Sequence, residues 1–157
     1  MKYSVYLLLF VFVTACNLDS AHNEVYVDPI DYKALNDKQI TDYLTTNNIE
    51  AEKTESGLYY TIENLGDGEQ PTATSNVTVA YKGYYLNGTV FDQSQNDGTT
   101  FALNRVIKGW TEGIPYFKEG GNGTLFIPSH LAYGSYNYNG IPGGSVLIFD
   151  VKLLSVN

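Results

Sequence analysis

The arrangement of apolar and polar positions changes near residue 57, where a strand-like pattern replaces a helical one. Beyond this point, short runs of β-branched and aromatic residues are separated by turns rich in glycine and asparagine. The run VTVAY alternates, so Val77, Val79 and Tyr81 fall on one face of a predicted strand. The Asn-Gly pair at 87–88 is typical of a tight hairpin and predicts that the chain then reverses. These patterns predict an antiparallel sheet within residues 57–157.

Runs of the same kind recur along this region, each bounded by glycine or by a polar turn residue. The predicted strands are residues 58–62, 77–86, 89–92, 101–103, 124–127 and 145–154. Between them, residues 110–117 can form one or two helical turns before the pair Gly120-Gly121 ends the segment. Five or six antiparallel strands with one short helix place this region in the α+β class.

A helical pattern precedes the sheet. Asn36 and Asp37 predict an N-cap, and Ile40 and Leu44 lie one turn apart, so we predict a short helix over about residues 37–47. This helix lies in a segment that spans residues 36–56, and it either caps the domain or serves as a spacer or dimerising arm. Residues 16–35 are polar and lack periodicity, which predicts a flexible tether.

Residues 1–15 have the features of a secretory signal peptide, with Lys2 followed by an apolar run over residues 5–13. The run is too short to span a bilayer, which needs about 20 apolar residues. The sequence VTAC resembles the bacterial lipobox, in which Cys16 is lipidated and becomes the first mature residue. The alternative is an ordinary signal peptide with a chance cysteine. Lipidation would anchor the chain in the bacterial cell envelope. Asn17, in place of the Asp linked to inner-membrane retention, favours the outer membrane.

Composition narrows the function. The chain has 157 residues, of which 43% are hydrophobic, so it can bury one core. Its formal net charge of −8 argues against binding nucleic acid through a basic patch. Cys16 is the only cysteine, which excludes an intramolecular disulfide. The two histidines show no ligand spacing, so we expect no metal and no cofactor.

Few residues are arranged for covalent catalysis. His130 follows Pro128-Ser129, but nothing in the sequence places it beside a nucleophile, and neither a Gly-x-Ser-x-Gly elbow nor a phosphate loop is present. The remaining candidates are aromatic residues and Asp92, which would be costly to bury without a partner. The single tryptophan, Trp110, lies where a strand pattern gives way to a helical one.

Five segments occur together in an order and spacing that resemble the FKBP-type peptidyl-prolyl isomerase family. They are VAYKG at 79–83, GTVFDQS at 88–94, VIKGWTEG at 106–113, IP with LAYG in 127–134, and IP with LIFDV in 141–151. The resemblance covers residues 57–157. The preceding helix and the sequence ESGLYY are also similar to bacterial envelope members of the family.

The resemblance implies a twisted antiparallel sheet wrapped around a short helix, with a pocket between them. Trp110 would be the pocket floor, Asp92 would lie at the rim, and Ile141 would cover the pocket from a loop. The Tyr133 hydroxyl and the Ile107 backbone N–H would donate to substrate carbonyls. Tyr81, Asp92 and Tyr133 are the implied catalytic residues, and the implied substrate-binding residues are Phe91, Val106, Ile107, Trp110, Ile141 and Phe149.

The implied activity is prolyl cis/trans isomerisation that assists the folding of envelope or exported proteins. Its partners would be prolyl peptides, unfolded envelope proteins and the macrolide inhibitors of the family. Two alternatives share the fold: a prolyl-peptide-binding chaperone or adaptor with negligible turnover, and a structural lipoprotein with a degenerate domain.

Two loops depart from the family pattern. Residues 93–100 form a loop that looks shorter than usual and lacks the Arg that often pairs the pocket Asp. The loop also lacks the aromatic residue often found two positions before Phe101, so we expect Phe101 to belong to the core rather than to the pocket. The second loop, residues 134–144, is rich in Tyr and Gly. Both loops would border the pocket and influence substrate preference.

Overall fold

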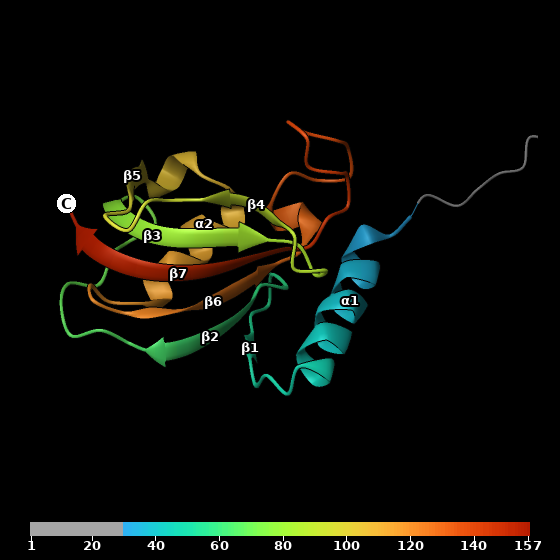
Figure 1. Cartoon of the computed structure of the whole chain (residues 1–157), viewed down its shortest axis with the longest axis horizontal. Coiled ribbons are helices and arrows are strands. Elements are labelled where there is room, and N and C mark those ends of the chain that lie inside the picture. Colours follow the sequence, from blue (N-terminus) through green and yellow to red (C-terminus); the bar gives the residue numbers. More distant parts are fainter. Residues whose placement is uncertain (1–29) are drawn as a thin grey trace, which may run out of the picture.

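The computed structural model describes residues 30–157, which form one antiparallel sheet and several helical segments (Figure 1). The helices are α1 (Tyr32–Thr46), η1 (Leu103–Arg105), α2 (Lys108–Gly113), η2 (Ile114–Tyr116) and η3 (Ser129–Leu131). The strands are β1 (Glu52–Lys53), β2 (Tyr59–Asn64), β3 (Asn76–Tyr84), β4 (Val90–Gln93), β5 (Thr99–Ala102), β6 (Asn122–Ile127) and β7 (Leu147–Val156). The predictions for the signal peptide, for Cys16 and for most of the tether lie outside the described residues.

The α+β class and the antiparallel sheet are confirmed. The sheet has seven strands in the order β1-β2-β6-β7-β3-β4, and β5 pairs with β3 beside β4. The count exceeds the five or six expected because β1 is a two-residue strand of exposed polar residues, which carries no hydrophobic signal. No helix within residues 30–157 is long and apolar enough to cross a bilayer.

The two faces of the sheet carry different cores, as alternation along the strands requires. One face buries Leu125 and Ile127 of β6 against α2. Two glycines permit this approach, because a Cβ at Gly109 would lie 2.5 Å from the Ile127 side chain and one at Gly113 would lie 2.8 Å from Leu125. The glycines therefore hold α2 close to the sheet and fix the depth at which Trp110 enters the core.

The N-terminal helix α1 packs on the other face of the sheet. Ile40 and Leu44 form a second apolar cluster with Phe126 of β6 and Ile148 of β7, whose side chains point away from α2. Of the two roles considered for this helix, the packing matches the capping one.

The start of α1 differs from the prediction. The helix begins at Tyr32, and the Asp31 carboxylate caps it by accepting hydrogen bonds from the backbone N–H groups of Lys33 and Ala34, at 3.0 and 3.2 Å. Asn36, which we predicted at the N-cap, lies fully buried inside the helix. Residues 32–35, which the prediction assigned to the tether, therefore belong to the helix, because Asp31 rather than Asn36 satisfies the first free N–H groups.

Candidate functional site

An aromatic cavity of about 260 Å³ opens between the sheet and the start of α2. Its lining residues are Tyr81, Asp92, Phe101, Arg105, Val106, Ile107, Trp110, Tyr133 and Phe149. They come from β3, β4, β5, β7, η1, α2, the connection between η1 and α2, and the segment after η3. Seven of the nine were predicted from the sequence, including Tyr81, Asp92 and Tyr133.

Trp110 lies at the base of this cavity and is only 4% exposed. Three rings meet its indole edge to face, with centroid distances of 5.2 Å to Tyr81, 5.4 Å to Phe101 and 5.3 Å to Phe149. Edge-to-face contacts of this kind are favourable arrangements for aromatic pairs. The Trp110 Nε1–H is buried and has no hydrogen-bond partner within residues 30–157. The base is therefore an aromatic ring that three other rings hold in place.

The rim of the cavity is polar. The Tyr81 hydroxyl donates a hydrogen bond of 2.8 Å to the Asp92 carboxylate. Burial, and then this hydrogen bond, raise the pKa of Tyr81 well above its ordinary value. Asp92 itself remains exposed, so the cost of burying its charge does not arise.

Two hydrogen-bond donors at the cavity are free. Neither the Tyr133 hydroxyl nor the Ile107 backbone N–H donates to any group in the described part of the chain. Burial, followed by the nearby Tyr138 and Asp92, raises the pKa of Tyr133, so its hydroxyl keeps its proton at neutral pH. The cavity thus combines an apolar floor with donors that a bound peptide could use.

Phe101 and Arg105 differ from the sequence-based expectations. Phe101 lines the cavity rather than the core alone, because β5 pairs with β3 in a register that sets Phe101 opposite Val77. Arg105, from η1, supplies a cationic side chain at the cavity although the 93–100 loop has no Arg. No ion pair joins Arg105 to Asp92 in the described residues. The only sequence feature that could have indicated Arg105 as a cavity residue is its position next to Val106.

Comparison with known proteins identifies the domain. The model of the family described as "FKBP-type peptidyl-prolyl cis-trans isomerase" matches residues 67–154. The chain belongs to this family. The resemblance inferred from the five sequence segments is therefore confirmed.

Similar relatives are bacterial. A protein of Aeromonas hydrophila named FKBP-type peptidyl-prolyl cis-trans isomerase FkpA is 42% identical over 143 residues, which cover 88% of this chain and 53% of the relative. The probable FkpA of Neisseria meningitidis serogroup B is 48% identical over 106 residues, which cover 66% of this chain and 39% of the relative. The chain thus spans about half the length, or less, of these curated relatives.

Solved structures share the fold. The crystal structure of FkpA from Escherichia coli superposes with a TM-score of 0.71 at 39% identity, covering 80% of this chain and 61% of that one. A peptidyl-prolyl cis-trans isomerase from Pseudomonas syringae gives a TM-score of 0.69 at 28% identity, covering 83% of this chain and 99% of that one.

Two predicted pocket residues of this FKBP-type domain do not line the cavity. Phe91 packs edge to face on Phe149, with a centroid distance of 5.5 Å, and Gly83 leaves room for both rings. Phe91 therefore packs against Phe149 without lining the cavity itself. Ile141 lies in the 134–144 loop, where it pairs with Tyr138 through backbone hydrogen bonds.

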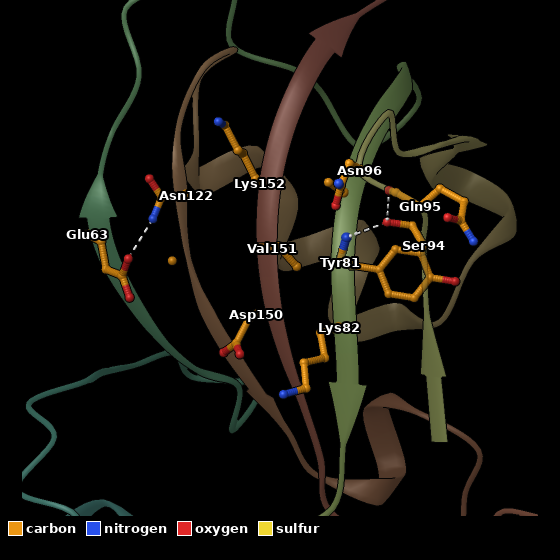
Figure 2. Close-up of a pocket in the computed structure, with 12 residues that line it drawn as sticks. Glu63, Tyr81, Lys82, Ser94, Gln95, Asn96, Asn122, Asp150, Val151 and Lys152 are labelled. Atoms are coloured by element: carbon orange, nitrogen blue, oxygen red, sulfur yellow. Dashed lines mark hydrogen bonds between the residues drawn. The ribbon is translucent and has the colours of Figure 1, made fainter. Parts of the chain in front are cut away.

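A larger groove of about 640 Å³ lies over the polar face of the sheet, and Figure 2 shows its side chains. Glu63 accepts a hydrogen bond of 2.6 Å from Asn122, and charged residues of β3 and β7 lie alongside. Tyr81 contributes its backbone N–H, which donates to the Ser94 hydroxyl at 2.9 Å. This groove has no aromatic floor, so the smaller cavity is the better candidate for binding a proline ring.

His130 is placed away from the aromatic cavity. Its Nε2 lies 2.8 Å from the carbonyl oxygen of Ser56, which anchors the turn before β2. No group of three or more His, Cys, Asp or Glu side chains that could hold a metal occurs within residues 30–157.

Proposed function

We propose that this chain is a peptidyl-prolyl cis-trans isomerase that acts on prolyl peptides and on unfolded proteins. The observation that supports this most is the aromatic cavity, whose rim carries two free hydrogen-bond donors, in a member of the FKBP-type family. Rotation about a prolyl bond breaks amide resonance and faces a barrier of about 18–20 kcal/mol, but it breaks no covalent bond. A site for this reaction therefore needs selective stabilisation of the twisted amide, not a nucleophile.

The proline ring of the substrate would pack on Trp110. The surrounding rings of Tyr81, Phe101 and Phe149 exclude water from this position. The twisted amide has lost its resonance and is less polar at the carbonyl than the planar amide. A dry apolar cavity therefore favours the twisted form over the ground state, which lowers the barrier.

The polar rim would hold the peptide on either side of the rotating bond. The Tyr133 hydroxyl and the Ile107 N–H would donate to flanking carbonyls, which fixes one part of the chain while the other rotates. Asp92, held by the Tyr81 hydroxyl, would lie beside the carbonyl that rotates. This assigns catalytic roles to Tyr81, Asp92 and Tyr133, and binding roles to Ile107 and Trp110.

We also propose that the protein is a lipoprotein of the bacterial cell envelope, anchored through Cys16 and directed to the outer membrane. The N-terminal apolar run and the VTAC sequence support this proposal. Its clients would then be envelope or exported proteins.

The test is a protease-coupled assay of a proline-containing tetrapeptide, with the full chain kept in detergent solution. We expect cis-to-trans conversion to accelerate in proportion to protein concentration. Trp110 is the only tryptophan, so its fluorescence reports peptide binding in the same samples. Binding without acceleration would favour the chaperone or adaptor alternative, and the absence of both would contradict the assigned cavity.

A further inference from the structure

The loop between η3 and β7 contains a tight turn. Tyr138 and Ile141 exchange two backbone hydrogen bonds, N–H to O, of 2.9 and 2.8 Å. The two residues between them, Asn139 and Gly140, have φ angles of +45° and +85°. Positive φ at both central residues defines a type I′ turn, for which Asn-Gly is the favoured pair. The tip of the loop is therefore a small hairpin with a fixed shape.

The loop is also closed at its base. The Gly144 N–H donates to the Gly134 carbonyl at 2.9 Å, and the Gly143 N–H donates to the Asn137 side-chain oxygen at 2.9 Å. Figure 1 shows the loop projecting from the end of the sheet, next to η3. Closure at both ends fixes the backbone that carries Tyr138.

That ring lies on Tyr133. The centroids of the two rings are 4.9 Å apart and their planes differ by 11°, which is a stacked arrangement. Tyr133 is 38% exposed and contributes the free hydroxyl at the cavity. Tyr136 belongs to the same loop but is 84% exposed and has no ring partner in the described residues. One loop tyrosine thus contacts the proposed donor and another does not.

We propose that Tyr138 is a positioning residue for isomerisation: held by the Asn139-Gly140 turn, its ring covers one face of Tyr133 and keeps the Tyr133 hydroxyl directed at the cavity. This proposal rests on the proposed isomerase function. A half-exposed tyrosine on an irregular segment would otherwise sample several side-chain rotamers. Stacking restricts these rotamers before substrate binds, so the donor need not be ordered during the reaction.

The substitution Tyr138→Ala tests the role of the ring. We expect kcat to fall by at least about twofold, and by no more than Tyr133→Phe lowers it, because Tyr138 acts through that hydroxyl. KM should change less than kcat, since Tyr138 does not itself line the cavity. Tyr138→Phe keeps the stack and should restore wild-type kcat. Tyr136→Ala is the matched control and should leave kcat unchanged.

A second variant tests the same role of Tyr138 by changing the backbone of the turn. Gly140→Val places a β-branched residue at positive φ and disrupts the turn without removing a ring, so it should lower kcat as Tyr138→Ala does. Its control is Gly88→Val, because Gly88 has a similar φ of +81° and, like Gly140, open space around its Cβ position, but lies in the β3–β4 turn.

The deciding measurement is the double variant. Because the two residues act as a unit, Tyr138→Ala should cause no further loss in a Tyr133→Phe background. Loss of the upfield ring-current shift of the Tyr133 ring protons in Tyr138→Ala would support the stack directly. An unchanged kcat in Tyr138→Ala, or an equal loss in both backgrounds, would overturn the proposal.

A wild-type chain that binds the peptide without acceleration would contradict the isomerase function alone. The positioning role would then be judged by peptide affinity from Trp110 fluorescence. Affinity should fall at least about twofold in Tyr138→Ala and stay unchanged in Tyr136→Ala. Equal affinities in the two variants would overturn the positioning role of Tyr138.

Discussion

Replacing Asn36 with alanine removes three hydrogen bonds, two of which join α1 to the segments on either side of Tyr133. The Asn36 side chain is 0% exposed. Its Nδ2 donates to the Gly144 carbonyl and to the Gln39 side chain, each at 2.9 Å, and its Oδ1 accepts from the Ser129 N–H at 2.8 Å. Ser129 opens η3, and Gly144 closes the 134–144 loop. A single buried amide therefore fixes both ends of the segment that carries Tyr133.

The size of the effect follows from what remains after the substitution. The Ser129 N–H and the Gly144 carbonyl belong to buried residues, and each would lose its Asn36 partner. An unsatisfied buried group costs about 1–3 kcal/mol, so the free energy of unfolding should fall by about 2–6 kcal/mol. This is a large part of the roughly 5–15 kcal/mol that stabilises a typical domain. For a domain of this size, the melting temperature should fall by about 7–20 °C.

Thermal and urea unfolding, followed by far-ultraviolet circular dichroism and by Trp110 fluorescence, measure this effect. Lys33→Ala is the control, because Lys33 is an exposed residue on the same helix. Melting of Asn36→Ala within about 2 °C of the control would refute the reasoning, since the buried groups would then have found other partners.

The other predictions concern the cavity and the anchor. Tyr133→Phe should lower kcat/KM by about threefold to tenfold without changing the melting temperature, and Asp92→Val should lower it at least as much, in the coupled isomerase assay. Because the pKa of Tyr81 is raised, its hydrogen bond to Asp92 should persist above pH 10, the usual tyrosine value. The bond should be lost only as pH rises through the folded-state pKa of Tyr81. A loss of activity centred at or below about pH 10 would contradict this prediction. Cys16→Ala should release the protein from the membrane fraction or leave it unprocessed, and a mature lipidated variant would exclude the lipobox.

Local patterns predicted the strands because alternation is a local property. Val77, Val79 and Tyr81 point to one side of β3, as their spacing required, and the aromatic cavity lies on that side. The Asn-Gly pair at 87–88 does connect β3 to β4. The family motifs also pointed to Trp110 and Asp92, and both residues line the cavity, Trp110 from α2 and Asp92 from β4.

The residues that the sequence predicted wrongly are placed by contacts between distant segments. Phe101 belongs to the cavity because β5 pairs with β3, a contact that residues 93–100 do not encode locally. The preference of asparagine for helix N-caps predicts that position for Asn36. In the structure its hydrogen bonds to Ser129 and Gly144 offset the cost of asparagine inside a helix. The strand β1 has only two exposed residues, too few for any periodicity.

The helix α1 belongs with the site, although none of its side chains lines the cavity. Tyr81 and Phe149 are held by the long β3–β7 pairing, which sets Gly83 opposite Phe149, so this side of the cavity is stabilised by the sheet itself. Tyr133 has no such support, because it lies outside any strand. Its position depends on Asn36 at the ends of its segment and on Tyr138 at its ring. The segment before residue 57, which the sequence sets apart from the domain, therefore contributes to the geometry of the rim through one buried amide.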